Sequence, residues 1–514
     1  MTEIVLTTDE TLMSNYHGMI VLGFGTSAPQ SVIPEMLFRF LIFPKLLMRG
    51  NSLPLAPLGL RKLEAKLLEM GYDVATVPPD RLREHLGDVK VLGVSTMDPF
   101  GWGPSTFTWR SILDGEPFVV RYFRKLMTSS AISEARKRGC KVIVGGQGAW
   151  QLQREPGALE ELNIDCVVIG EGERAAPRLI QKALRGEQLP RFYEVSRDEI
   201  PPLDEIPEIR GGTICGITEI GRGCPRGCRF CTVTLQQLRW FPLDRIEREI
   251  EVNKRAGVKD GTFHAEDVLL YGSKGVLPNR EKLLRLTELG LKHYRHLGWS
   301  HLSLAAVSAD PELVRMVMEM VREKQPWLGM EVGIETGSPR LVEMHMPGKV
   351  KPFKIEEWPE VVHRSMGIMH DNHMVPYCTF IIGLPGETDD DVIKTIELLD
   401  ELREFKSIFI PLFFVPWGRM SKEKRFRMEF LSDAQKEMMK CCLNHSLHWI
   451  NEFAKEFFAE SWYRQILYPG YQFLYNRIRE MARREGLLEE EYMKVRHGLR
   501  LKRLKGGVAG GVAS

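Results

Sequence analysis

The 514-residue sequence has almost no net charge, few cysteines and no long apolar run. Its 70 basic and 68 acidic residues nearly cancel, so no overall field favours nucleic acid as an obligate partner, although a local basic groove stays open. Nine cysteines in so long a chain, and no recognisable secretory leader, favour the reducing cytoplasm. The length predicts two or three globular domains.

The most apolar early segment, residues 33–48, is interrupted by Glu35, Arg39, Pro44 and Lys45, which exclude a membrane span of about 20 apolar residues. Met36, Phe40 and Phe43 are spaced to share one face of a helix. Such a face can lie along a membrane surface, but a lid or core helix is the favoured interpretation. We therefore expect a cytoplasmic protein, with peripheral membrane contact as the open alternative.

The first 200 residues alternate short apolar runs with longer helical patterns, which is typical of a doubly wound, Rossmann-like α/β domain. We expect helices near residues 60–70 and 118–139. The segment 196–209 is rich in proline and acidic residues and indicates a linker to the next domain. Strands are expected at residues 18–25, 72–77, 89–96, 141–146 and 165–173.

A second α/β array is expected over residues 201–425, followed by a helical region over 426–514 with a flexible, glycine-rich tail. Six strand and helix units of this kind predict a partial (β/α)6 barrel similar to a TIM barrel, with functional residues at the carboxyl ends of its strands. The expected strands are residues 216–223, 261–267, 301–310, 328–337, 375–387 and 407–417.

Three cysteines, Cys224, Cys228 and Cys231, follow the first of these strands in a loop with the spacing C-x3-C-x2-C. A 4Fe-4S cluster normally has four protein ligands, so three thiolates leave one iron open to a small molecule. A zinc site would need a fourth Cys or His at short spacing, and none follows closely after Cys231. The other six cysteines look like small core residues. The loop also carries arginines that can offset the charge of a cluster, at positions 222, 226 and 229.

This loop, with Phe230 before its last cysteine, resembles the signature of the radical S-adenosylmethionine (SAM) superfamily. The resemblance implies a 4Fe-4S cluster held by the three cysteines, SAM as a second cofactor, and an electron donor such as ferredoxin or flavodoxin. In that superfamily the amino and carboxylate groups of SAM chelate the open iron. An electron from the cluster then breaks the sulfonium bond and gives a 5′-deoxyadenosyl radical.

Four later segments, HAED (264–267), LSLAAVSAD (302–310), GIETGSP (333–339) and FIIGLPGET (380–388), resemble successive barrel strands of the same superfamily. Glu266 or Glu335 can accept hydrogen bonds from an ammonium group or ribose hydroxyls, a salt bridge being the alternative for each. Gly383 allows close approach to adenine or only makes a turn. The resemblance implies SAM contacts at Phe230, Glu266, Asp267, Ser303, Glu335 and Gly383.

The first domain resembles the cobalamin-binding domain that precedes the barrel in one branch of these enzymes. The resemblance rests on STMDPFGWGPST (95–106), VGGQGA (144–149) and VIGEGE (168–173), at the carboxyl ends of expected strands. The D-x-H-x-x-G motif, which supplies an axial histidine to cobalt, is absent from the first 200 residues. Two alternatives therefore stay open: the domain binds cobalamin without an axial ligand from the protein, or it has lost the cofactor. The candidate cobalamin contacts are Ser95, Thr96, Gly145, Gly146, Gly170 and Gly172.

The leading functional hypothesis is an enzyme that abstracts hydrogen from a substrate carbon and then methylates, couples or cyclises it. Methyl transfer is favoured if cobalamin binds, and the apolar segments suit a lipid or isoprenoid substrate among small organic molecules. One alternative is a non-catalytic iron-sulfur electron carrier. Another is a tRNA methylthiotransferase, which also carries GIETGSP and GLPGET, but with an additional N-terminal cluster domain and a small basic β-barrel. This sequence shows neither, so no nucleic-acid partner is expected.

Overall fold

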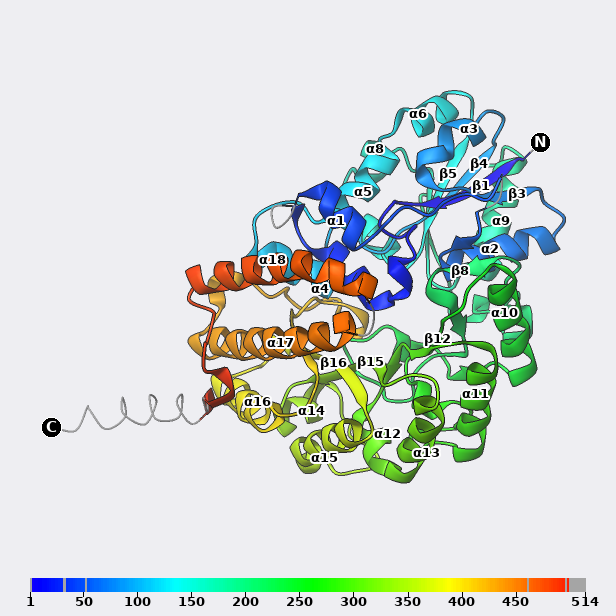
Figure 1. The fold of residues 1–514 in the computed structure, drawn as a ribbon. Coiled ribbons are helices and arrows are strands. Elements are labelled where there is room, and N and C mark those ends of the chain that lie inside the picture. Colours follow the sequence, from blue (N-terminus) through cyan, green and yellow to red (C-terminus); the bar gives the residue numbers. More distant parts are fainter. Residues whose placement is uncertain (1, 31–33, 51–52, 460–461, 495–496, 499–514) are drawn as a thin grey trace. The chain divides into compact units, whose positions relative to one another are not determined.

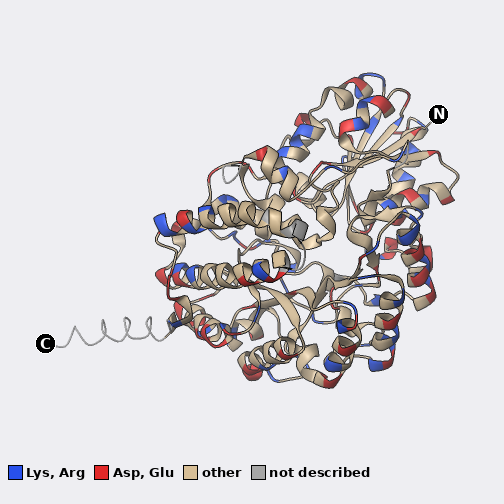
Figure 2. Ribbon diagram, in the orientation of Figure 1, with Lys and Arg blue, Asp and Glu red and all other residues tan. Residues whose placement is uncertain are grey.

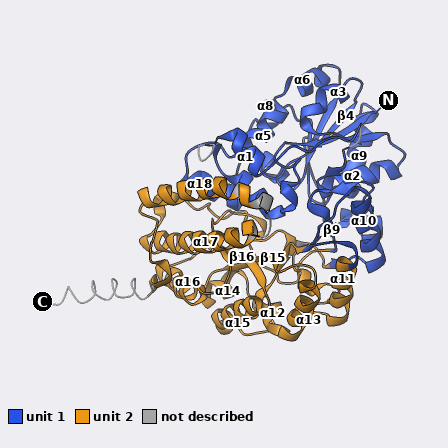
Figure 3. Ribbon diagram, viewed as in Figure 1, with its two compact units in different colours: residues 1–220, 239–263, 292–297 blue, residues 221–238, 264–291, 298–514 orange. Residues whose placement is uncertain are grey.

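The computed structural model describes residues 2–30, 34–50, 53–459, 462–494 and 497–498, shown as a ribbon in Figure 1. The expected glycine-rich tail and Ile33 lie outside the described residues. The chain divides into two compact units (Figure 3). The first comprises residues 1–220, 239–263 and 292–297, and the second comprises residues 221–238, 264–291 and 298–514.

The first unit is built on a six-stranded sheet in the order β3-β1-β4-β5-β6-β7, in which all paired strands are parallel. Helices α2 and α9 cover one face, and α3, α5, α6, α7 and α8 cover the other. Helices on both faces of a parallel sheet make the predicted doubly wound architecture. The strands are β1 Ile4–Thr8, β3 Val74–Thr76, β4 Val91–Ser95, β5 Lys141–Gly145, β6 Cys166–Ile169 and β7 Phe192–Glu194.

Several short helices complete this unit, and a two-residue parallel pair joins β2 (Leu55–Ala56) to β8 (Gly212–Thr213). The helices are α1 Glu35–Leu41, α2 Leu58–Glu69, α3 Leu82–His85, α4 Pro104–Ile112, α5 Phe118–Met127, α6 Ser130–Lys137, α7 Ala149–Arg154, α8 Ala158–Glu161, α9 Gly172–Leu184 and α10 Leu243–Arg255.

Two predictions for this unit are wrong in detail. Residues 20–27 form a 3-10 helix, and the strand expected at 18–25 is absent. Three glycines in that stretch remove the side chains that would pack a strand, whereas Ile4–Thr8 is rich in β-branched residues, fully buried and forms β1. The helix expected over 118–139 is two helices, α5 and α6, because Ser129 adopts an extended conformation between them.

The second unit contains a four-stranded parallel sheet in the order β14-β15-β16-β17. A separate three-stranded sheet has the order β13-β12-β9. The strands of these two sheets are β9 Ile217–Glu219, β12 Gly261–His264, β13 Leu297–Trp299, β14 His301–Leu302, β15 Leu328–Glu335, β16 Met374–Ile382 and β17 Ile408–Phe413, with β10 Gly221–Arg222 and β11 Arg239–Trp240 as short pieces. Of these, β9 and β11 belong to the first unit.

Helices follow these strands as the alternation predicts, and two long helices close the described chain. They are α11 Arg280–His293, α12 Leu304–Ala309, α13 Pro311–Arg322, α14 Pro339–His345, α15 Trp358–Asp371, α16 Asp389–Leu402, α17 Asp433–Ala459 and α18 Trp462–Arg484. The predicted α/β class, with a doubly wound sheet, the parallel strands of a partial barrel and a helical C-terminal region, is confirmed.

The third expected barrel strand, 301–310, is mostly helical. Only His301–Leu302 pairs as a strand, and Leu304–Ala309 forms α12. The sequence LAAVSA combines good helix formers with an apolar run that strand and helix patterns share. Ser303 therefore lies at the junction of a strand and a helix, at the carboxyl end of the strand, where functional residues were expected.

The apolar segment 34–48 does not present the single face predicted from its spacing. Met36 and Phe40 are 86% and 62% exposed, whereas Phe43 is buried against Phe38 and Phe118. Among the described residues, no helix is long and apolar enough to cross a membrane. Basic and acidic residues are both scattered over the helices of the two units (Figure 2), consistent with the balanced charge of the sequence.

Candidate functional site

The cysteine loop lies in the second unit and is held by hydrogen bonds to its backbone. The Thr234 hydroxyl donates to the carbonyl oxygens of Cys228 and Cys231 at 3.2 and 3.0 Å. The Arg229 amide donates to the carbonyl of His345 at 2.9 Å, which anchors the loop to the end of α14. Cys228 is buried, and Cys224 and Cys231 are partly exposed.

The zinc alternative for this loop requires a compact set of four ligands. Among the described residues, the three thiols do not form a group whose ligand atoms all lie within 4.8 Å of one another. A single zinc ion with bonds of about 2.3 Å would hold its sulfur ligands about 3.8 Å apart. Among the described residues, the loop cysteines therefore do not form the compact four-ligand set that a structural zinc ion takes.

The electrostatics of the loop keep these thiols protonated until a metal replaces the protons. Burial raises the pKa of Cys224 to about 12 and that of Cys231 to about 11, and it also raises the pKa of Cys228. Negative charge adds to the effect, from Asp267 at Cys224 and from Glu266 at Cys231. Metal ligation requires thiolates, so binding of iron here releases protons.

Asp267, Ser303 and Arg226 form a buried polar group beside the loop. The Ser303 hydroxyl donates to Oδ2 of Asp267, and Nη2 of Arg226 lies 3.6 Å from the same oxygen. Nη1 of Arg226 donates to the carbonyl oxygens of Lys349 and Lys351, each at 3.0 Å. Burial raises the pKa of Asp267, and the charge of Arg226 opposes that shift.

Three atoms of this group have no hydrogen-bond partner among the described residues although they are buried. They are Nε and Nη2 of Arg226 and Oδ1 of Asp267. A buried polar atom without a partner costs roughly 1–3 kcal/mol, so a ligand that supplies both an acceptor and a donor would be favoured here. The carboxylate and ammonium groups of an amino acid have that chemistry.

Glu335 takes the salt bridge that was the alternative to a ligand contact. It ends β15 with a φ of +68°, an uncommon conformation for a residue with a side chain. Its carboxylate accepts hydrogen bonds from Nζ of Lys349 at 2.7 Å and from the Thr379 hydroxyl at 3.2 Å. The charge of Lys349 also opposes the burial that raises the pKa of Cys228. Glu335 and Lys349 therefore lie within electrostatic range of the loop.

Phe230 and Gly383 lie in an apolar part of the same unit. Phe230 packs on a buried cluster that includes Leu341, Leu384 and Phe414. Gly383 has a φ of +82°, and a side chain there would overlap the ring of Phe426. Close packing by protein thus already accounts for the glycine, whereas its expected contact with adenine stays a prediction.

Glu387 holds the turn that contains Gly383. Its Oε1 accepts hydrogen bonds from the Gly383 amide at 2.9 Å and from Nε2 of Gln435, on α17, at 2.6 Å. Burial raises the pKa of Glu387 to about 7.

A polar row on the sheet of the second unit was missed by the sequence analysis. The strand register pairs His301 with Glu331 and Glu331 with Tyr377, so the three side chains share one face. Alternate residues of β15 on this face, Gly329, Glu331 and Gly333, are partly exposed, whereas their neighbours are buried. The signal available was one polar residue, His301, Glu331 or Tyr377, within each of three largely apolar strands.

Nε2 of His301 lies 3.4 Å from Oε2 of Glu331, and the two side chains are 33% and 27% exposed. Burial alone would lower the pKa of His301, but the hydrogen bond and charge of Glu331, with Glu266, raise it to about 9. The row therefore presents a carboxylate fixed by an imidazolium beside the Tyr377 phenol.

In the first unit, four of the candidate cobalamin contacts lie at two neighbouring strand ends. Ser95 ends β4 opposite Gly145 at the end of β5, and the Thr96 amide donates to the Gly145 carbonyl at 2.9 Å. A side chain on Gly146 would lie 2.6 Å from the Thr96 carbonyl oxygen. The structure thus brings Ser95, Thr96, Gly145 and Gly146 together at the carboxyl edge of the sheet.

Gly170 and Gly172 flank the turn after β6. Gly170 has a φ of +116°, and a side chain there would lie 2.8 Å from Cβ of Val195. Gly172 begins α9 and has ordinary space around it. Gly170 is therefore required by the turn, whereas nothing around Gly172 requires a glycine.

Of two buried polar atoms at this edge, the sequence had singled out the one on Thr96 and missed the one on Asp9. Oδ2 of Asp9 and Oγ1 of Thr96 have no hydrogen-bond partner among the described residues. Asp9 directly follows β1 and Thr96 directly follows β4, and these two strands are paired. At the end of the pair, the Thr8 hydroxyl donates to the Ser95 carbonyl at 2.8 Å. The carboxyl edge of a doubly wound sheet, where ligands bind, therefore carries polar atoms that the protein itself does not satisfy.

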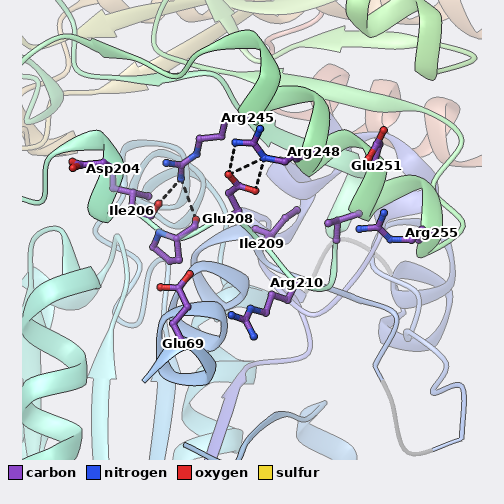
Figure 4. Close-up of a pocket in the computed structure, with 12 residues that line it drawn as sticks. Glu69, Asp204, Ile206, Glu208, Ile209, Arg210, Arg245, Arg248, Glu251 and Arg255 are labelled. Carbon is purple, nitrogen blue, oxygen red and sulfur yellow. Dashed lines mark hydrogen bonds and ion pairs between the residues drawn. The ribbon is translucent and has the colours of Figure 1, made fainter. Parts of the chain in front are cut away.

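A charged pocket of about 600 Å³ also lies in the first unit, and Figure 4 shows its lining. Arg248 contacts Glu208 at 2.7 Å, and Arg245 donates to the carbonyls of Leu203 and Ile206. These bonds fasten the expected linker segment 196–209 to α10. The pocket contains none of the residues expected to bind a cofactor.

A comparison with protein families matches residues 218–399 to the model of the Radical SAM superfamily. An uncharacterised protein of Methanopyrus kandleri is 26% identical over 63% of this chain and 66% of its own length. A tRNA-2-methylthio-N(6)-dimethylallyladenosine synthase of Magnetococcus marinus is 27% identical over 44% of this chain and 50% of its own length. The chain thus spans about half to two thirds of the length of these curated relatives.

Among solved structures, the chain is similar to the radical S-adenosylmethionine methyltransferase TsrM of Kitasatospora setae, determined with cobalamin and a [4Fe-4S] cluster bound. The TM-score is 0.52 at 15% identity, and the match covers 82% of this chain and 74% of that one. A second TsrM structure, with tryptophan and a SAM analogue bound, gives the same TM-score at 16% identity. At this identity the likeness concerns the fold.

Proposed function

Because residues 218–399 match the model of the Radical SAM superfamily, we propose that the chain is a SAM-cleaving enzyme that methylates or forms a carbon-carbon bond in a small organic substrate. The observation that carries the proposal is the three-cysteine loop beside buried Arg226 and Asp267, three of whose polar atoms lack hydrogen-bond partners among the described residues. Loop and polar group belong to one compact unit, which the family match largely covers.

Cys224, Cys228 and Cys231 fit a 4Fe-4S cluster by donor type, because all three are free thiols in one loop. When bound, such a cluster supplies the electron for reductive cleavage of SAM. Two of the loop arginines have different roles in this proposal. Arg226 is buried and balances negative charge at the cysteines, whereas Arg229 is exposed and fastens the loop to α14 through the Met344 carbonyl at 3.3 Å.

Arg226 and Asp267 orient the amino-acid part of SAM in this proposal. The free donors of Arg226 suit a carboxylate, and Oδ1 of Asp267 suits an ammonium group. Ser303 fixes the Asp267 carboxylate by donating to its other oxygen. Glu335, held by Lys349 and Thr379, keeps a negative charge nearby, and Glu266 lies within electrostatic range of Cys231.

The polar row presents a substrate-binding surface in this proposal. Glu331, fixed by His301, accepts hydrogen bonds from a substrate donor, and Tyr377 can donate or accept. Further along the same sheet, Ile408, Ile410 and Leu412 of β17 are partly exposed. A substrate with one polar end and an apolar body, such as a lipid or isoprenoid, would contact both.

Cobalamin is proposed as the second cofactor of the first unit. The unsatisfied Oγ1 of Thr96 and Oδ2 of Asp9 fit hydrogen bonds to its polar periphery, and Ser95 offers a further hydroxyl. When bound, cobalamin supplies a methyl group to the substrate. The first 200 residues lack the D-x-H-x-x-G motif, so the proposal places no protein histidine on cobalt.

A labelling experiment tests the reaction class. The reconstituted, reduced enzyme is incubated with SAM carrying a deuterated methyl group and a cellular extract divided into small-molecule, lipid and RNA fractions. We expect 5′-deoxyadenosine and a deuterated product in the small-molecule or lipid fraction. Formation of 5′-deoxyadenosine without label in any fraction would favour carbon-carbon bond formation, and no 5′-deoxyadenosine would favour the electron carrier.

The second candidate function is modification of tRNA, because several curated relatives are tRNA-2-methylthio-N(6)-dimethylallyladenosine synthases. Against it, the described part of the first unit is a doubly wound sheet whose cysteines lie apart, in strands and turns. Deuterated methylthio nucleosides in the RNA fraction, with no label in the other two, would establish this candidate and contradict the first.

A further inference from the structure

The C-terminal helical region brings together three side chains with metal-binding chemistry. Glu437 and Cys441 are four residues apart on α17, so they share one face of that helix. His497 comes from the last described part of the chain. One oxygen of Glu437, the sulfur of Cys441 and one ring nitrogen of His497 all lie within 4.8 Å of one another.

The group is buried and its hydrogen bonding is incomplete. His497 and Cys441 are 0% and 1% exposed, whereas the side chain of Glu437 keeps 18% exposure and gives a path from solvent. Nδ1 of His497 lies 2.5 Å from Oε1 of Glu437. Its Nε2 is buried and has no partner among the described residues. A buried imidazole with one unsatisfied nitrogen is costly, which indicates a missing ligand.

The chain around His497 is held by specific bonds, so the histidine is positioned. The Gly498 amide donates to Oδ2 of Asp400 at 3.0 Å, and Nη1 of Arg403 donates to the Met493 carbonyl at 3.1 Å. Gly498 also approaches α16 closely, because a side chain there would lie 2.5 Å from Cγ of Glu397. Metal sites depend on ligands that the fold holds in place in this way.

We propose that Glu437, Cys441 and His497 bind a zinc ion. Carboxylate oxygen, thiolate sulfur and imidazole nitrogen are the three ligand types that zinc takes in proteins, and water can complete the tetrahedron from the side of Glu437. With bonds of about 2.0–2.3 Å, these ligands would stand roughly 3.2–3.8 Å apart, so small side-chain rotations suffice. Cys441 loses its proton to solvent as zinc binds. The ion fastens the end of the described chain to α17.

Zinc binding is tested in full-length protein carrying Cys224→Ala, Cys228→Ala and Cys231→Ala, which removes the thiols that would compete. After equilibration with zinc and dialysis against a weak chelator, mass spectrometry should find about one zinc per chain. Adding His497→Gln, Glu437→Gln or Cys441→Ser should weaken zinc affinity more than about tenfold. Cys442→Ser, which changes the adjacent buried cysteine outside the group, should leave zinc unchanged.

The proposal is overturned if the parent protein keeps no zinc, or if His497→Gln binds zinc as tightly as the parent. Circular dichroism and gel filtration show whether each variant is folded. If Cys441→Ser is unfolded, His497→Gln and Glu437→Gln decide the outcome. Since the parent protein lacks the three cysteines proposed to bind the cluster, the result of this test does not depend on SAM chemistry.

Discussion

At the scale of single residues, Arg226 connects three parts of the candidate SAM site. It lies in sequence between Cys224 and Cys228, donates to backbone carbonyls at Lys349 and Lys351, and faces Asp267 at 3.6 Å. A buried arginine is costly unless its charge and donors are used. The donors left over among the described residues are therefore the clearest residue-scale indication of a ligand.

Asp267→Asn tests this assignment. The substitution keeps the shape of the side chain and an oxygen for the Ser303 hydroxyl, but removes the negative charge that would pair with an ammonium group. We expect normal iron content and an affinity for SAM at least about tenfold lower, equivalent to about 1.4 kcal/mol. Equilibrium binding of SAM measures it, with the exposed Asp433→Asn as control. Unchanged affinity in Asp267→Asn would remove Asp267 from the site.

Glu387 gives a pH-dependent prediction. Burial raises its pKa from 4.5 to about 7, so between these values the folded protein binds more protons than the unfolded chain. Its contribution to stability is present below about pH 4.5 and is lost as the pH rises through 7. Since the side chain is partly exposed, we expect a loss of about 1–2 kcal/mol.

Thermal unfolding of Glu387→Gln measures this loss. Relative to wild type, the variant should gain stability between pH 4.5 and pH 8, because glutamine carries no charge into the buried site. Exposed Glu429→Gln serves as control and should show no such gain. A Glu387→Gln difference that stays constant across this range would show that the carboxylate is not destabilised by burial.

At the scale of elements, β14, β15 and β16 carry the proposed substrate surface. Their register aligns His301, Glu331 and Tyr377 in one row, and the alternation of exposure along β15 shows that this face is only partly covered. Parallel strands fix such rows by backbone hydrogen bonds alone, so the row is rigid. Rigid strands suit a surface that must hold a substrate in one orientation.

Glu331→Gln and Tyr377→Phe should separate substrate handling from SAM cleavage. Among the described residues, neither side chain forms a hydrogen bond or ion pair with the cysteine loop. Iron content and SAM-dependent 5′-deoxyadenosine formation should therefore persist in both variants. Product formation should fall by about tenfold or more, because each change removes a hydrogen bond to substrate. Exposed Glu319→Gln is the control. Loss of 5′-deoxyadenosine in step with product would contradict the division of roles.

Element positions also show what the sequence could predict. Five of the six strands expected over 201–425 were recognised because their apolar runs end in glycine or acidic turns. The segment 301–310 failed because Leu304–Ala309 suits strand and helix alike, and only tertiary packing selects the helix. The pairing of Glu331 with His301 and Tyr377 could not be predicted, since register depends on three-dimensional alignment.

The same distinction holds within the site. The three cysteines were predicted from spacing alone, because the loop is local in sequence. Lys349, which forms the salt bridge with Glu335, lies 14 residues further along the chain, and Phe426, whose ring packs on Gly383, lies 43 residues further along. No local sequence pattern indicates either contact. Asp9 was overlooked because the strand before it was assigned to residues 18–25.

At the scale of the whole molecule, two units each carry a candidate cofactor site at the carboxyl ends of parallel strands. In our proposal the first unit binds cobalamin, and the second unit binds the cluster and SAM. In doubly wound sheets and in closed α/β barrels alike, ligands bind at that end. One chain thus combines two architectures that follow the same rule.

Thr96→Val tests the cobalamin proposal. It removes a buried hydroxyl of nearly the same shape, whose oxygen has no partner among the described residues. After incubation with cobalamin and gel filtration, wild type should retain a corrinoid absorption band, and Thr96→Val should bind about tenfold more weakly. Thr128→Val, at an exposed helix end, should bind as wild type does. Absence of the band in wild type would contradict a cobalamin site.

The central claim is that the three-cysteine loop starts the chemistry by cleaving SAM, and chromatography for 5′-deoxyadenosine tests it most directly. Anaerobically reconstituted wild type with about four irons per chain, once reduced and given SAM, should form 5′-deoxyadenosine. Cys228→Ala should form none, and Cys215→Ala, at a buried cysteine outside the loop, should retain activity. A fully loaded wild type without this product, or a fully active Cys228→Ala, would contradict the claim.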